Sequence, residues 1–204
     1  GEIVNLTESG YSDTQGKFVL DGKAILFHSD RSGYRSHGSW GAQSDLYLMF
    51  HDRETFEDFK LSKEEREHHK ELKDLNKKDT ASADKKDSKK SKKTAKKVDE
   101  EKKDTKPFTP DFTDRENRVI RLTSASGSLS DALINSDGTK LYYIMRYGED
   151  ADLWEKDLVS KTTKVLSPKI GYGELRLGKD GKTIYVGTSY GGLSKVESSG
   201  TVKP

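Results

Sequence analysis

The sequence contains no cysteine among its 204 residues. This absence excludes disulfide bonds, cysteine-ligated metals and a thiol nucleophile. Hydrophobic residues make up only 30% of the chain and charged residues 35%, which is lean for one large core. We therefore expect the polar excess to be concentrated in particular segments.

Long apolar runs are also absent. No stretch approaches the roughly 20 apolar residues of a membrane-spanning helix. The first residues lack the charged-then-apolar pattern of a signal peptide. The sequence starts at Gly1 rather than at a methionine, so we expect a segment of a longer protein, with any targeting signal upstream. The net charge of +2 argues neither for nor against a nucleic-acid or membrane partner.

A pattern of strand, Asp-Gly and strand occurs three times. The pairs are Asp21-Gly22, Asp137-Gly138 and Asp180-Gly181, each flanked by apolar runs. Such a pair predicts a tight hairpin turn, because glycine accepts the positive φ that a two-residue turn requires. The runs after the pairs are apolar on both faces, as in Leu141-Tyr142-Tyr143-Ile144, which predicts interior strands covered by neighbouring sheets.

The spacing of these turns predicts the fold. Asp137 and Asp180 lie 43 residues apart, and β-propeller blades have roughly 40–45 residues and four strands each. A meander in a sandwich or barrel is the alternative, but it does not usually repeat turn chemistry and strand order in register. We therefore predict an all-β arc of a β-propeller, with about three four-stranded antiparallel blades and a polar insertion. Further blades are expected outside the chain.

Two insertions lengthen the first repeat, because Asp21 and Asp137 are 116 residues apart. One enlarges a loop over 31–43, and the other spans 53–115. In the second, Ser62 and Glu65 form a capping box that predicts a short helix over about 62–75. From Asn76 to Lys106 the chain is rich in Lys, Asp, Ser and Thr and has too few apolar residues to offset the entropy of ordering, which predicts a disordered linker.

These boundaries divide the chain into four predicted parts. Residues 1–52 would hold the outer strand of a preceding blade and the first three strands of the first blade. The charged insertion follows over 53–115. Residues 116–167 would complete the first blade and form the second, and 168–204 would form an incomplete third blade.

The enlarged loop carries the strongest functional signal. It gathers, among glycines, Arg31, Arg35, His37, Ser39 and Trp40. Recognition loops held on a rigid sheet have this composition. The spacing Gly38-Ser39-Trp40-Gly41 does not match the nucleophile elbow Gly-x-Ser-x-Gly, so no catalytic residue is predicted. A structural loop between blades is the preferred interpretation, and contact with a ligand or protein partner is the alternative.

Two other polar segments contain residue types that occur in binding sites. His68 and His69 lie among glutamates but lack the His-Glu-x-x-His order of zinc peptidases, so a solvated helix face is expected and no metal. The lysine-rich run over 85–97 has the charge to contact phosphates, yet aspartates interrupt it and aromatic residues are absent from it. A solubilising linker is therefore expected rather than a nucleic-acid contact. No cofactor is predicted.

The repeated motifs resemble a known family. The Asp-Gly turns together with Ser29-Asp30-Arg31 and Asp45-Leu46-Tyr47 resemble a Tol-type propeller blade. The long loop followed by a Lys/Glu-rich insertion is similar to the N-terminal propeller of bacterial tricorn-protease-like serine peptidases. The family's usual proline before Asp-Gly is replaced by Leu20, Ser136 and Lys179.

This resemblance implies a non-catalytic propeller segment that guides or filters peptide or unfolded-protein substrates toward a serine-peptidase domain outside the chain. The first strand of each blade would line its channel, around Phe18–Leu20, Ala132–Ile134 and Leu175–Leu177. The remaining blades and the catalytic domain of the parent protein are the implied partners. A homo-oligomer of the parent and a cytoplasmic or periplasmic location both stay open. A Tol-type scaffold propeller that binds a protein partner is the alternative.

Overall fold

The computed structural model describes residues 3–36, 41–69, 71–72, 109–188, 191–197, 200 and 202–203. In these ranges the strands form three four-stranded sheets, and each strand pairs antiparallel with the next along the chain. Blade 1 contains β1 (Asp13–Val19), β2 (Ala24–Ser29), β3 (Asp45–Phe50) and β4 (Val119–Arg121). Blade 2 contains β5 (Ser128–Ile134), β6 (Lys140–Arg146), β7 (Ala151–Asp157) and β8 (Thr163–Ser167). Blade 3 contains β9 (Gly173–Leu177), β10 (Thr183–Thr188), β11 (Leu193–Glu197) and β12 (Val202–Lys203).

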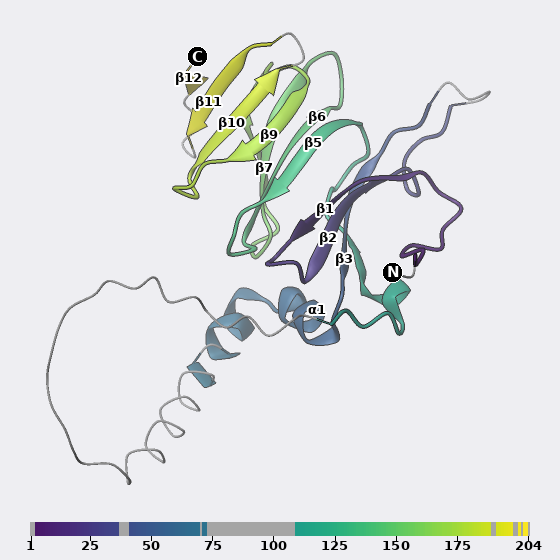
Figure 1. Cartoon of the computed structure of the whole chain (residues 1–204). Coiled ribbons are helices and arrows are strands. Elements are labelled where there is room, and N and C mark those ends of the chain that lie inside the picture. The colour runs from purple at the N-terminus through teal and green to yellow at the C-terminus, as the bar shows by residue number, and fades with distance from the viewer. Residues whose placement is uncertain are drawn as a thin grey trace, which may run out of the picture.

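The three blades lie next to one another in chain order, face to face (Figure 1). One apolar cluster joins blade 1 to blade 2, with Leu26 and Leu48 on one side and Leu141 and Tyr143 on the other. A second cluster joins blade 2 to blade 3 in the same way. Burial of apolar side chains on both faces of the middle sheet is the main stabilising term in this packing. The chain is thus an arc of a β-propeller, as the repeat predicts.

The Asp-Gly turns recur, but each hairpin loop has four residues rather than two. The loops are 20–23, 136–139 and 179–182. Glycine is the third loop residue in each, with φ of 82°, 71° and 66° in chain order. Its N–H donates to the carbonyl three residues earlier, as in Gly138 to Asn135 at 3.0 Å. Positive φ is the reason glycine recurs here, and the turn type differs from the sequence prediction.

The insertion begins with a helix that the sequence analysis did not predict, α1 (Arg53–Lys60). The Asp52 carboxylate accepts a hydrogen bond from the Thr55 N–H at 2.7 Å and caps its first turn. The rings of Phe59 and Phe56 pack on Phe50, with centroids 5.0 and 5.6 Å away. These aromatic contacts anchor the insertion to the core between blades 1 and 2.

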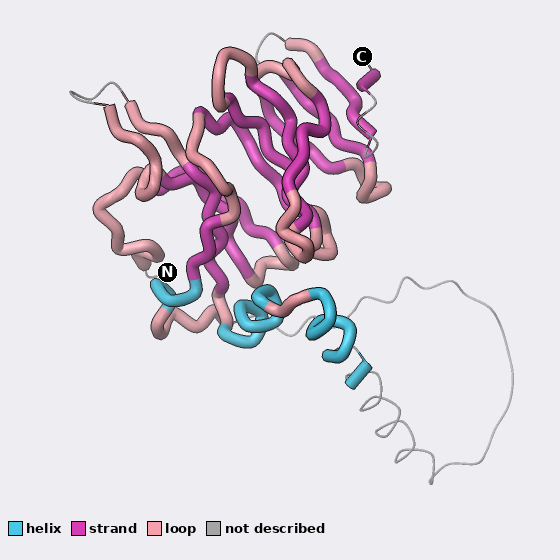
Figure 2. Tube along the Cα trace, turned by 180° about the vertical axis from the view of Figure 1, so that it is seen from behind, coloured by secondary structure: helices cyan, strands magenta, loops and turns pink. Residues whose placement is uncertain are grey.

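A second helix follows at 63–69, below the sheets in Figure 2. The predicted capping box forms at its start: the Ser62 N–H donates to Glu65 Oε2 at 2.8 Å, and the Glu65 N–H donates to Ser62 Oγ at 3.3 Å. Residues 71–72 are also helical. The end of the predicted helix range 62–75 and the predicted linker from Asn76 to Lys106 lie outside the described residues.

The chain returns to blade 1 beside the point where it left. The Asp111 N–H donates to the His51 carbonyl at 2.9 Å. The buried Arg118 donates to the Phe50 carbonyl and to the Asp111 carboxylate, both at 3.2 Å. A 3₁₀ helix, Arg115–Arg118, then leads directly into β4, which pairs with β3 and completes blade 1.

The structure differs from the sequence prediction at both ends of the arc. Residues 3–12, where the outer strand of a preceding blade was predicted, form no strand. The carbonyls of Asn5 and Leu6 accept hydrogen bonds from Arg115 instead, at 3.1 and 2.9 Å. At the other end, blade 3 is predicted to be incomplete but contains four strands, the last with only two residues.

The anchoring of α1 predicts the effect of a substitution. Phe59→Ala removes a buried ring that the core cannot refill, so we expect the free energy of unfolding to fall by about 3 kcal/mol. Urea denaturation followed by tryptophan fluorescence measures it. Glu57→Ala is the matched control on the same helix, because Glu57 is half exposed in its ion pair with Lys60. An equal, small effect of both substitutions would contradict the docking of α1.

Candidate functional site

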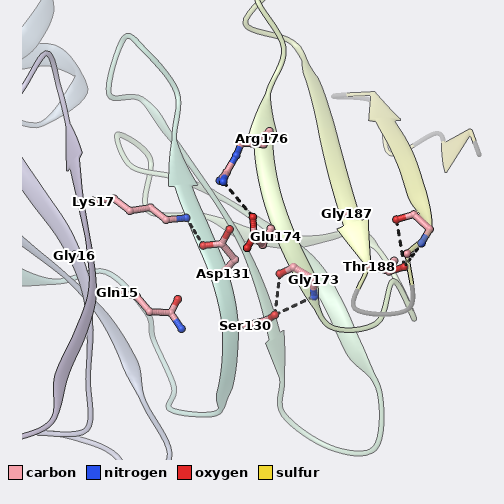
Figure 3. A pocket seen from close by; sticks show the side chains of 12 residues that line it. Gln15, Gly16, Lys17, Ser130, Asp131, Gly173, Glu174, Arg176, Gly187 and Thr188 are labelled. Atoms are coloured by element: carbon pink, nitrogen blue, oxygen red, sulfur yellow. Dashed lines mark hydrogen bonds and ion pairs between the residues drawn. The ribbon is translucent and has the colours of Figure 1, made fainter.

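A hollow of about 790 Å³ opens along the first strands of all three blades. It is lined by Gln15, Gly16, Lys17, Ser130, Asp131, Gly173, Glu174, Arg176, Gly187, Thr188, Gly191 and Gly192. Five of these twelve residues are glycines, so much of the wall is main chain (Figure 3). The sequence analysis placed the channel on these strands but around Phe18–Leu20, Ala132–Ile134 and Leu175–Leu177. The hollow lies nearer the N-terminal ends of the same strands.

One buried carboxylate, Asp131 on β5, joins the first strands of the three blades. The Lys17 ammonium reaches across from β1 and pairs with Asp131 Oδ1, and it also donates to the Ala132 carbonyl at 3.2 Å. From the other side, the Leu175 N–H of β9 donates to Asp131 Oδ2 at 2.8 Å. A buried carboxylate is tolerated when an ammonium group and N–H donors surround it. The Asp131 side chain therefore links β1, β5 and β9.

The neighbouring Ser130 forms a second link between β5 and β9. Its hydroxyl donates to the Gly173 carbonyl at 2.8 Å and accepts from the Gly173 N–H at 3.0 Å. The register of β5 with β6 shifts between Leu129 and Asp131, a bulge that re-aims side chains at this point. Side chains of blade 2 thereby bind main-chain groups at the edge of blade 3, as Figure 3 shows.

A buried histidine lies close to this junction. His28 on β2 pairs across the sheet with Thr14 and Leu46 and is 6% exposed. Burial lowers the pKa of His28 to about 4, because the imidazolium form loses its hydration. Nearby Asp131 raises this pKa and nearby Lys17 lowers it further. The imidazole is therefore neutral at neutral pH.

Arg31, a predicted contact residue, lies at the base of the enlarged loop and contacts blade 1. Its guanidinium donates to both carboxylate oxygens of Asp13 at 3.0 Å and to Ser29 Oγ at 2.9 Å. It also lies over the Tyr47 ring, 4.8 Å from the centroid. Burial alone would raise the pKa of Asp13, but hydrogen bonds from Ser29, Ser9 and Arg31 lower it. Arg31 thus fixes the base of the enlarged loop to blade 1.

The enlarged loop extends from blade 1 as an arm (Figure 1). Arg35 pairs with Ala42 across it, and the Gln43 N–H donates to the Tyr34 carbonyl at 2.9 Å. The Arg35 guanidinium binds the Asp30 carboxylate at 3.0 Å and lies 4.9 Å from the Tyr11 ring centroid. The structure thus brings Arg31 and Arg35 together around Tyr11. The other predicted contact residues, His37, Ser39 and Trp40, lie outside the described residues.

None of the residues that line the hollow was predicted from the sequence as a contact residue. The repeat itself carried a usable signal: Gln15, Asp131 and Glu174 each stand six residues before the Asp of their Asp-Gly turn. All three occupy the first strand of a blade and line the hollow. Polar residues at the same position of all three repeats point to a shared surface.

The hollow is lined by negatively and positively charged side chains that can form hydrogen bonds. Glu174 and Arg176 project from β9 with side chains 76% and 68% exposed, joined to each other at 3.1 Å.

The described residues contain no group of three histidine, aspartate or glutamate side chains that could hold a metal ion. Within the same part of the chain, no helix has the length and apolarity needed to cross a membrane.

Comparison with known proteins shows a relationship in fold alone. No protein-family model and no curated protein matches the chain. The structure of TolB from Acinetobacter baumannii is similar with a TM-score of 0.52 and 18% identity, and the match covers 96% of this chain and 32% of TolB. The tricorn protease structure gives a TM-score of 0.45 and 12% identity over 94% of this chain and 16% of that chain. The chain therefore spans about a third of TolB.

The buried imidazole predicts a pH dependence of stability. His28 has a lower pKa in the folded than in the unfolded protein, so its stabilising contribution is complete above about pH 6.5 and is lost as the pH falls toward 4. We expect the free energy of unfolding to drop by up to about 3 kcal/mol over this window, and His28→Gln to flatten the drop. Urea unfolding at several pH values measures it. The exposed His68→Gln is the control and should keep the wild-type slope; equal slopes for all three proteins would contradict the assignment.

Proposed function

We propose that this propeller arc is a non-catalytic segment that binds extended peptides in the hollow between its first strands. In this proposal it guides them toward a serine-peptidase domain outside the chain, as the sequence resemblance to tricorn-like peptidases implies. The observation that supports the proposal is the hollow itself, which all three blades build together. The structural similarity to TolB supports the assignment of the fold and gives no information about a ligand.

The size and wall of the hollow suit a peptide. Its volume of about 790 Å³ lies in the range of roughly 300–1,000 Å³ that is usual for ligand sites. At Gly187 and Gly191 a second main chain can approach closely, because a Cβ built at either position meets no heavy atom within 4 Å. Glu174 offers an acceptor and Arg176 offers donors on the same strand. Extended peptides are commonly bound through hydrogen bonds to their main-chain N–H and C=O groups.

The hollow does not support catalysis by its own residues. The hydroxyl of Ser130 is engaged with both the N–H and the carbonyl of Gly173. Among the described residues that line the hollow, none is a histidine or cysteine that could activate a nucleophile. Its positively charged side chains form ion pairs with carboxylates. The hollow therefore lacks the excess of positive charge that binds phosphates, and nucleic acid is not proposed as a ligand.

A blocking substitution tests the proposal. A Cβ built at Gly187 meets no heavy atom within 4 Å, so Gly187→Trp fills the hollow without a clash at its base. We expect it to weaken binding of a short fluorescein-labelled unstructured peptide at least about tenfold in fluorescence anisotropy, because roughly 1.4 kcal/mol of contact is lost. Gly148→Trp is the matched control, since its Cβ also meets open space but lies outside the hollow. Unchanged binding by Gly187→Trp, or no binding by the wild type, overturns the proposal.

The arm favours a second candidate function, contact with a protein partner as in a Tol-type scaffold. Tyr34 on the arm is 72% exposed, and the ion pairs of Arg31 and Arg35 hold the arm in place. A large exposed aromatic side chain on a fixed support is typical of interaction surfaces. In this candidate function Arg31 and Arg35 position the arm, and His37, Ser39 and Trp40 join Tyr34 in the contact.

Site-specific cross-linking tests the second candidate. A photo-reactive amino acid at position 34 should yield one discrete adduct with a partner protein in extracts, and Trp40→Ala should abolish the adduct. The same amino acid at position 185 in blade 3 is the control, because Tyr185 is partly exposed there but far along the arc from the arm. A smear at both positions, or an adduct that persists in Trp40→Ala, contradicts a specific arm contact.

A further inference from the structure

Another cavity lies at the base of the insertion, between the start of α1 and the segment that returns to β4. Its volume is about 500 Å³, within the range of roughly 300–1,000 Å³ that is usual for ligand sites. All of its lining residues fall between Arg53 and Arg118, and none belongs to a strand. The cavity is therefore built by the chain between β3 and β4 and not by a face of blade 1 that stacks on another sheet.

Most of the charged groups around this cavity are already paired. The buried Arg118 donates to the Asp111 carboxylate at 3.2 Å, and the Thr113 N–H donates to the same carboxylate at 2.9 Å. Hydrogen bonds from Thr113 and the charge of Arg118 lower the pKa of Asp111, so this carboxylate stays ionised beside the guanidinium. On the α1 side, Glu57 pairs with Lys60 at 3.3 Å. These groups contribute no unbalanced charge to the cavity.

Two charged side chains on different walls of the cavity are not paired. Arg53 is the first residue of α1, and Asp114 directly precedes the 3₁₀ helix of the returning segment. Both residues are exposed and both line the cavity. Among the described residues, neither the Arg53 guanidinium nor the Asp114 carboxylate has an ion pair or a side-chain hydrogen bond. One wall thus offers a positive group and the other a negative group, and they do not pair with each other across the cavity.

We propose that this cavity binds a small zwitterion, an α-amino acid or a dipeptide, whose carboxylate pairs with Arg53 and whose ammonium group pairs with Asp114. A guanidinium suits a carboxylate because two of its N–H donors match the two oxygens. The amide of Asn117 lines the same cavity and can donate to the carboxylate or accept from the ammonium group. The Phe56 ring is also part of the wall and offers an apolar surface to the side chain of the ligand.

The two opposite charges make the cavity selective. A simple anion would be attracted by Arg53 and repelled by Asp114, and a simple amine would experience the reverse. A ligand must therefore carry both groups to bind well. The inference does not rest on the proposed function, because the hollow between the first strands shares no residue with this cavity.

Leucine and leucyl-leucine are the probes, measured by isothermal titration calorimetry with the full chain. Each is compared with its amide, which lacks the carboxylate, and with its N-acetyl form, which lacks the ammonium group. We expect at least one of the two zwitterions to bind, and each of its blocked forms to bind about tenfold more weakly or worse. The stronger of the two shows whether the cavity takes a single amino acid or a dipeptide.

Variants at the two charged residues assign the contacts. Arg53→Gln should abolish the preference for the zwitterion over its amide and keep the preference over its N-acetyl form. Asp114→Asn should do the opposite, and asparagine tolerates the positive φ of 51° at this position. Glu54→Gln and Glu116→Gln are the matched controls and should behave as the wild type, because these exposed neighbours lie outside the cavity.

Three results would overturn the zwitterion site. These are a wild type that binds neither zwitterion, a wild type that binds the blocked forms equally well, and variants at Arg53 and Asp114 that keep both preferences. None of these results bears on peptide binding in the hollow, which is tested separately by Gly187→Trp.

Discussion

The buried carboxylate of Asp131 is the interaction on which the inner side of the arc depends. The first strand of each sheet is an edge strand. When blades stack, these edge strands lie close together, and their main-chain N–H and C=O groups need hydrogen-bond partners. Asp131 resolves this between blades by accepting from Lys17 on one side and from Leu175 on the other. Apolar packing holds the faces of the blades together, whereas this polar junction sets how the first strands approach one another and so shapes the hollow.

The architecture was predictable because it is repeated. A glycine with positive φ is required at the same place in each hairpin loop, so the Asp-Gly pairs recur at Gly22, Gly138 and Gly181. Strands that are buried on both faces must be apolar on both faces, which made the second strand of each blade visible in the sequence. The capping box of Ser62 and Glu65 was equally local and formed as predicted.

The hollow and the role of the arm depend on contacts between distant segments, which a single sequence does not display. A Cβ on Gly173 would meet the Gly187 carbonyl oxygen at 2.3 Å, so this glycine is explained by strand approach and not by any local motif. The contacts of Arg31 with Asp13 and Tyr47 are of this kind, because these residues lie 18 and 16 positions away in the sequence. Helix α1 was missed because its two phenylalanines owe their burial to Phe50 on β3.

The return of the chain beside its point of departure has a consequence for what blade 1 tolerates between β3 and β4. The bonds of Asp111 to His51 and of Arg118 to Phe50 close the base of the insertion independently of what lies between. The pairing of β3 with β4 therefore depends little on the length of the intervening chain. Each doubling of the length of such a loop costs only about 0.6 kcal/mol in closure entropy. Blade 1 thus has an attachment point at which the inserted segment can change in length at little cost to the pairing of β3 with β4.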